Sequence, residues 1–135
     1  MVVDVPDVEI LGKFADGNNP QNKGYAASDQ IMKTLEKLFF LAKKNQGSNY
    51  KSLGNVRIDN FNRWSKADIY FGTNSALKEL KEKLNVKTLD FIELNKCISD
   101  LINSDALLPL SLKFQGGNLI IKIANFPANW FFAKS

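Results

Sequence analysis

The sequence predicts one domain of the α/β (α+β) class, in which a mixed sheet of about four strands packs with about three helices. Three observations support this class. The chain has 135 residues, the length of a single domain. Apolar residues follow helical spacing in some segments and two-residue alternation in others. The composition is 44% hydrophobic and 24% charged, which is typical of a globular domain with a real core.

Three segments have the apolar spacing of a helix. The first covers residues 28–44, with Ser28 as its expected N-cap and two lysines at its C-terminal end, where the helix dipole favours cations. The second is short, and Ser75 is its expected cap. The third is expected to begin at Thr88 and to end near residue 103.

Four segments read as strands, and all four contain β-branched, aromatic or leucine residues. They cover residues 56–61, 67–72, 107–114 and 118–124. The last two flank Gly116-Gly117, and paired glycines supply the positive φ angles that a tight hairpin turn needs.

The chain divides into three parts around this core. We expect residues 1–24 to be an extended arm and loop; the first eleven residues alternate weakly and could be an edge strand or an extended arm. The core then covers residues 25–126. Residues 127–135 form an aromatic tail that contains Trp130, Phe131 and Phe132.

Basic residues are concentrated in two blocks. The chain carries a formal charge of +4. Residues 30–66 contain eight basic and two acidic groups, a net charge of +6, and residues 106–135 contain three lysines and no acid. If the two blocks meet in space, they form a basic surface that suits nucleic acid or another acidic partner.

The first basic block interleaves cations with aromatic residues, a combination that can bind phosphates and stack bases. The aromatic residues are Tyr50, Phe61 and Trp64; the alternative is that Phe61 and Trp64 belong to the core. The candidate nucleic-acid contacts are Lys43, Lys44, Lys51, Arg57, Arg63 and Lys66.

Several kinds of chemistry are excluded by composition. The chain has no histidine, so it has no Ser-His or Cys-His nucleophile and no His-based zinc site. Its one cysteine, Cys97, excludes an internal disulfide. A bound metal would need oxygen ligands, as Mg²⁺, Mn²⁺ and Ca²⁺ do. We expect no membrane partner and a reducing, intracellular location, in host cytoplasm or a virion.

Two short motifs resemble the core signature of the PD-(D/E)xK nuclease superfamily, which includes many restriction endonucleases. Asp68 begins one strand segment, and Ser111-Leu112-Lys113 lies in another. The wider set Trp64-x-x-Ala67-Asp68-Ile69-Tyr70, Glu93-Leu94-Asn95 and Ser111-Leu112-Lys113 is similar to a group of phage proteins. The resemblance covers about residues 60–125 and implies a restriction-endonuclease-like core.

The resemblance implies a Mg²⁺-dependent site for phosphodiester hydrolysis. Asp68 would be the metal carboxylate and Lys113 the catalytic lysine, which would assist the attacking water. Glu36 matches the glutamate that the superfamily often has on its first core helix. Ser111 stands where a second acid is usual, and Glu93 is the nearest acid by motif that could replace it.

Structural roles are the alternative for each of these residues. Alternation along the strand puts Lys113 and Ser111 on the face opposite Leu112, which would place the lysine in water. Asp68 could be a strand-entry residue beside Lys66, and Glu36 could be an ordinary charge on a helix surface.

Two functions therefore follow from the sequence. The first is a nucleic-acid-associated phage or viral protein, for DNA rather than RNA, that resembles a Mg²⁺-dependent nuclease; an active hydrolase and an inactive relative are both compatible with it. The second is a non-enzymatic viral assembly protein, oligomeric or bound to other virion proteins, whose tail, residues 127–135, docks on a neighbouring chain.

Overall fold

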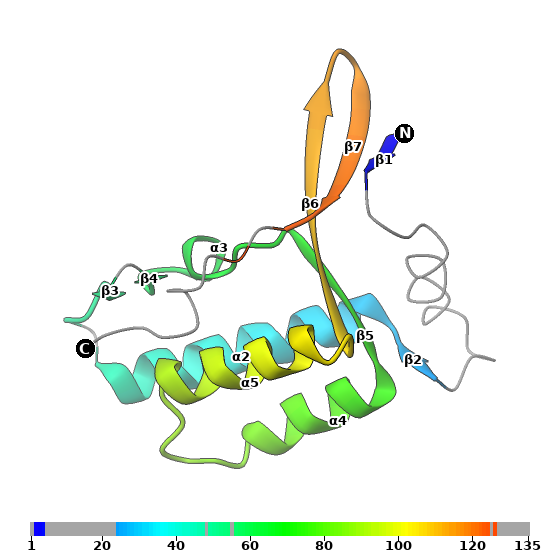
Figure 1. Ribbon diagram of the computed structural model, residues 1–135. Coiled ribbons are helices and arrows are strands. Elements are labelled where there is room, and N and C mark those ends of the chain that lie inside the picture. Colours follow the sequence, from blue (N-terminus) through cyan, green and yellow to red (C-terminus); the bar gives the residue numbers. More distant parts are fainter. Residues whose placement is uncertain (1, 5–23, 48, 55, 125, 127–135) are drawn as a thin grey trace.

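The computed structural model describes residues 2–4, 24–47, 49–54, 56–124 and 126. These residues form an α+β fold, in which helices pack against a five-stranded sheet (Figure 1). The predicted fold class is therefore confirmed. The elements in chain order are β1 (Val2–Asp4), β2 (Tyr25–Ala26), α2 (Ser28–Gln46), β3 (Ser52–Leu53), β4 (Val56–Arg57), α3 (Phe61–Trp64), β5 (Ile69–Thr73), α4 (Asn74–Lys83), α5 (Phe91–Asn103), β6 (Leu107–Gln115) and β7 (Asn118–Ile123).

The large sheet is mixed and has the strand order β1-β7-β6-β5-β2. Strand β1 pairs in parallel with β7, and the other neighbours pair in an antiparallel way. Of the two alternatives for the first eleven residues, an edge strand is therefore present at residues 2–4. Strands β3 and β4 form a separate antiparallel pair.

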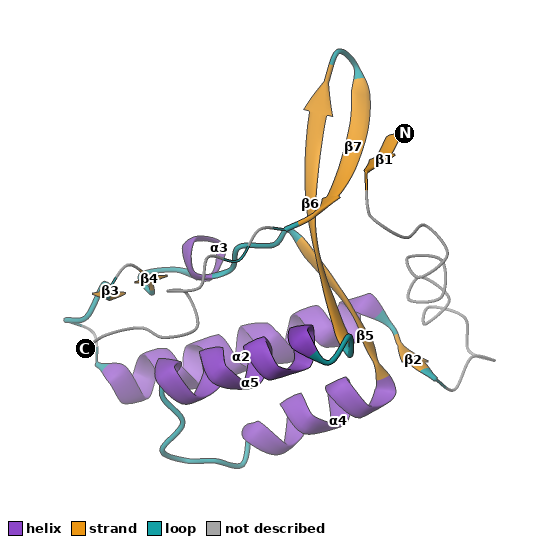
Figure 2. Ribbon diagram, in the orientation of Figure 1, coloured by secondary structure: helices purple, strands orange, loops and turns teal. Residues whose placement is uncertain are grey.

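The core lies between the helices and the sheet, and α2 and α5 run side by side (Figure 2). Each helix buries its apolar stripe, because this removes apolar surface from water. Helix α2 approaches β5 closely: a Cβ added to Gly72 would lie 3.0 Å from Cδ1 of Ile31. A larger residue at position 72 would therefore require the side chains of Ile31 and Leu107 to shift. The largest fully buried side chains are Trp64, Tyr70, Phe39, Phe91, Ile31, Leu35, Leu38, Ile58, Leu80, Leu89 and Leu94.

The helix caps differ from those that the sequence predicted. Thr73 caps α4, because its side chain accepts a hydrogen bond from the backbone N–H of Ala76 at 3.1 Å. Asp90 caps α5 in the same way, through the N–H of Glu93 at 2.8 Å. Ser75 and Thr88 are therefore not the caps of these helices. Ala27 occupies the N-cap position of α2, and no side chain makes a capping hydrogen bond there. Ser28 is therefore the first residue of the helix and not its N-cap.

The strand predicted over residues 56–61 is shorter than expected. Strand β4 ends at Arg57, because the chain turns at Asp59 and Asn60. The side chain of Asn60 then caps α3 by accepting a hydrogen bond from the N–H of Arg63 at 2.9 Å.

Strands β6 and β7 form the predicted hairpin around Gly116 and Gly117, which have φ angles of 56° and 83°. The hairpin extends away from the helices (Figure 1). Cross-strand pairs give it one apolar face, on which Phe114 is 78% exposed. The opposite face carries Lys113 and Lys122.

None of the described helices is long and apolar enough to cross a membrane. The aromatic tail at residues 127–135 and most of the arm predicted over residues 1–24 lie outside the described residues.

Candidate nucleic-acid interface

Basic side chains from α2, β4 and α3 form the candidate nucleic-acid interface, and the C-terminal end of α2 contributes two of them. Lys43 and Lys44 lie in its last turn, where their charges interact favourably with the helix dipole. The helix ends at Gly47, whose φ angle of 96° suits glycine and whose N–H donates to the carbonyl of Lys43.

The β3–β4 pair brings in Arg57. Leu53 and Val56 are paired with each other and are buried, so they fix the short hairpin to the core. Arg57 pairs with Ser52 on the exposed side of the hairpin. Its side chain keeps 49% of its surface exposed.

Helix α3 carries Arg63 and is held in place by Trp64. The indole of Trp64 is fully buried, and its N–H donates to Oδ1 of Asn95 on α5 at 2.7 Å. The ring packs with those of Phe39, Phe61 and Phe91, at centroid distances of 5.5, 5.8 and 6.1 Å. Trp64 is thus a core residue, and Phe61 is half-buried against it.

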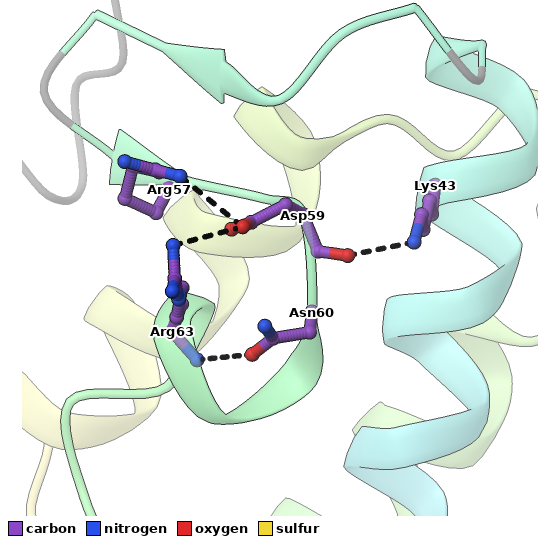
Figure 3. Close-up of polar contacts among 5 residues, drawn as sticks. All are labelled: Lys43, Arg57, Asp59, Asn60 and Arg63. Atoms are coloured by element: carbon purple, nitrogen blue, oxygen red, sulfur yellow. Dashed lines mark hydrogen bonds and ion pairs between the residues drawn. The ribbon is translucent and has the colours of Figure 1, made fainter.

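Asp59 joins these three elements (Figure 3). Its Oδ2 accepts from Nη2 of Arg57 and from Nη1 of Arg63, both at 3.2 Å. Its backbone carbonyl accepts from Nζ of Lys43 at 2.7 Å. We call Lys43, Arg57, Asp59 and Arg63 the Asp59 cluster.

The Asp59 cluster fixes two guanidinium groups without neutralising the surface. Arg63 keeps 57% of its side chain exposed, so N–H groups of both arginines remain open to a ligand. Residues 43–66 contain six basic groups and one acid, Asp59, for a net charge of +5. Lys44, Lys51 and Lys66, which belong to the same stretch of chain, are also exposed.

The two arginines affect the ionisation of the Asp59 carboxyl group. Its partial burial raises the pKa, but the hydrogen bond from Arg57 and the charges of Arg57 and Arg63 outweigh this effect. The pKa is therefore lowered from the ordinary value of 3.8.

The structure brings together three of the six predicted contacts, Lys43, Arg57 and Arg63. The sequence analysis missed Asp59, which organises them. A signal was available, because Asp59 stands two residues after Arg57 and four before Arg63. The spacing from Asp59 to Arg63 is that of an ion pair on one helical turn.

The two residues predicted for catalysis lie on neighbouring antiparallel strands, at β5 and β6. Asp68 directly precedes β5, and its N–H donates to the carbonyl of Leu110 at 2.8 Å. Its Oδ2 accepts from the backbone N–H of Leu112 at 2.7 Å. Asp68 therefore binds the backbone one residue before Lys113, which is exposed on the hairpin as alternation predicted.

The two glutamates predicted to join Asp68 lie on other surfaces. Glu36 is exposed on α2, in a shallow depression with Lys33, Lys37 and Phe40. Glu93 on α5 forms an ion pair with Lys83 at 3.2 Å. In the described part of the chain, no three His, Cys, Asp or Glu side chains lie close enough together to hold a metal ion.

Comparison with protein-family models, curated protein sequences and solved structures gave no match to this chain. The functional interpretation therefore depends on its own geometry.

Substituting Asn for Asp59 should destabilise the protein in a pH-dependent way. A lowered carboxyl pKa stabilises the fold above the unfolded-state pKa, and this stabilisation is lost as the pH falls through the folded-state pKa. The difference in free energy of unfolding between the wild type and Asp59→Asn should be constant near neutral pH and should shrink below pH 3.8. Urea denaturation at several pH values measures it.

The matched control is Asp100→Asn. Asp100 pairs with Lys96 at 3.0 Å, but the two side chains are 64% and 69% exposed. An exposed pair contributes little, so this variant should change stability less than Asp59→Asn. An equal effect of the two variants would show that Asp59 does not organise the cluster.

Proposed function

We propose that the protein binds the phosphodiester backbone of nucleic acid through the Asp59 cluster and the exposed lysines of the same stretch of chain. One observation carries the proposal: a single carboxylate oxygen holds the guanidinium groups of Arg57 and Arg63 at 3.2 Å each. Two arginines from different elements are thereby fixed side by side on a surface with a net charge of +5 over residues 43–66.

A fixed guanidinium pair suits phosphate for two reasons. Guanidinium is planar and presents N–H groups in a fork that matches two phosphate oxygens. Its position is already set by Asp59, so less side-chain entropy is lost when a phosphate binds. The exposed Lys44, Lys51 and Lys66 add charge without fixed geometry, which contributes affinity that is independent of base sequence.

The double variant Arg57→Gln/Arg63→Gln should bind DNA at least about tenfold more weakly, because two charge-assisted contacts are lost. The slope of log K against log salt concentration should also fall by roughly two, about one for each phosphate contact removed. Fluorescence anisotropy with labelled DNA in a KCl series measures both quantities.

Lys78→Gln/Lys81→Gln is the matched control, since it removes the same charge from the exposed side of α4. It should leave the salt slope almost unchanged. Equal losses in the two double variants would show that binding follows net charge alone, and the Asp59 cluster would then have no special role.

Phosphodiester hydrolysis, as the nuclease resemblance implies, is a more specific proposal. It is supported by the neighbouring positions of β5 and β6, with Asp68 bound to the backbone beside Lys113. The described residues do not supply a set of three metal-binding carboxylates, so they do not fit a Mg²⁺ site built from Asp68, Glu36 and Glu93. Hydrolysis therefore needs a different set of ligands, whereas binding through the Asp59 cluster needs none.

Removing divalent cations with EDTA should leave DNA binding unchanged, because the Asp59 cluster contacts phosphate without a metal. The same samples, incubated with plasmid DNA and MgCl₂, test hydrolysis in the wild type and in Lys113→Ala. Lys113 is exposed, so this variant should fold. Mg²⁺-dependent cleavage that disappears in Lys113→Ala would support the nuclease role with Lys113 as its catalytic lysine. Equal cleavage by both proteins would exclude that role for Lys113, and no cleavage by the wild type would count against hydrolysis.

An assembly role is the second candidate, and the apolar face of the β6–β7 hairpin favours it. Leu112, Phe114 and Ile123 are 40%, 78% and 41% exposed on this face. We propose a second copy of this chain as the occupant. Lys113 and Lys122 lie on the opposite face, so two hairpins packed face to face keep these charges in water.

The variant Phe114→Asp should abolish self-association, because it places a charge in the centre of the apolar contact. Sedimentation velocity over a concentration series measures the oligomeric state. Lys113→Asp, on the opposite face, is the control and should leave the state unchanged. A wild type that is monomeric at all concentrations would contradict the assembly role for the hairpin, and deletion of residues 127–135 tests the aromatic tail separately.

A further inference from the structure

Tyr50 is an exposed aromatic residue in the segment that joins α2 to β3. Its side chain is 54% exposed. Its N–H donates to the carbonyl of Gly47 at 3.3 Å, and its ring atom Cδ2 would lie 3.8 Å from a Cβ on Gly47. The ring therefore lies near Gly47 at the end of α2, whose last turn carries Lys43 and Lys44.

Backbone pairing of β3 with β4 brings the chain at Tyr50 close to the cluster. Ser52 pairs with Arg57, and the N–H of Ile58 donates to the carbonyl of Lys51 at 2.9 Å. The residue directly after Tyr50 is thus bonded to Ile58, the residue between Arg57 and Asp59, so the backbone at Tyr50 lies close to that of the cluster.

Tyr50 is suited to a role that the other aromatic residues of this region cannot perform. The ring of Trp64 is fully buried, and Phe61 is half-buried and packed against the core. Among the described aromatic residues of positions 43–66, Tyr50 is therefore the most exposed. The neighbouring cations bind phosphate, and an open ring beside them can stack on a nucleobase.

We infer that the protein binds unpaired nucleic acid, with one base stacked on Tyr50 while Arg57 and Arg63 hold the adjoining phosphates. This inference rests on the proposed function. Bases in a duplex are stacked on both sides by their neighbours, so only an unpaired base can offer its face to the ring. The shared ligand chemistry is an unpaired nucleotide segment, of DNA or of RNA.

Fluorescence anisotropy tests the inference with labelled oligo-dT, oligo-rU and a DNA duplex. Tyr50→Ala should bind oligo-dT or oligo-rU about tenfold more weakly, the typical effect of losing one stacked base. Binding of the duplex should change less than twofold. The salt slope should stay the same, because no charge is removed, and a variant with damaged arginine positions would not keep it.

Two further variants make the result specific. Tyr50→Phe keeps the ring and should restore binding of single strands. Phe40→Ala removes an aromatic residue of almost the same exposure, 55%, that lies next to Glu36 and outside the cluster, and it should have no effect.

The possible failures are distinguishable. If Arg57→Gln/Arg63→Gln loses binding while Tyr50→Ala binds single strands normally, the stacking role is wrong and the proposed function stands. If Tyr50→Ala weakens duplex and single-strand binding equally, the ring does not recognise an unpaired base. If the wild type binds none of the three probes, both proposals are wrong.

Discussion

The buried indole of Trp64 is the contact on which the basic surface depends. Helix α3 is only four residues long, too short to be stable alone, so its position comes from its side chains. Trp64 fills the space between α2 and α5, and its N–H reaches Asn95 at 2.7 Å. Because Trp64 directly follows Arg63, the same burial sets where this guanidinium emerges, and Asp59 can then reach it and Arg57 together.

The carboxylate of Asp68 solves a second structural problem, at the boundary between the sheet and the projecting hairpin. Strand β5 pairs with β6 only as far as Leu110, so the next outward-facing N–H of β6, that of Leu112, has no strand partner there. Asp68 supplies the acceptor at 2.7 Å. Asp68 thus acts at the entry of β5 by accepting a hydrogen bond from the next strand, which is the alternative to metal binding. The residue that resembles a nuclease carboxylate is engaged in holding the sheet.

The hairpin separates apolar and charged side chains by alternation alone. Its lysines, Lys113 and Lys122, share one face, and Leu112 and Phe114 share the other. Charged residues near exposed strands discourage uncontrolled pairing between sheets. The molecule thus presents two surfaces of different chemistry: the basic end around α3 and the apolar face of β6 and β7. In the sequence, Lys66 lies between the residues of these two surfaces. It comes two residues before Asp68, whose carboxylate binds the backbone of β6.

The sequence by itself determined the α+β class, the long helix, the glycine hairpin and the solvent face of Lys113, because each follows from interactions between residues close along the chain. It also placed three of the cluster's cations among its candidates. Only the tertiary structure decided that Asp59 joins Lys43, Arg57 and Arg63, since Lys43 and Asp59 are 16 residues apart and meet only when α3 is docked on α2. The tertiary structure also decided the burial of Trp64 and Tyr50, two aromatic residues of the same basic stretch. Trp64 is buried in the core, whereas Tyr50 is exposed to solvent. Spacing predicts which residues share a face of one element, but packing against distant elements decides which of those faces remain in water.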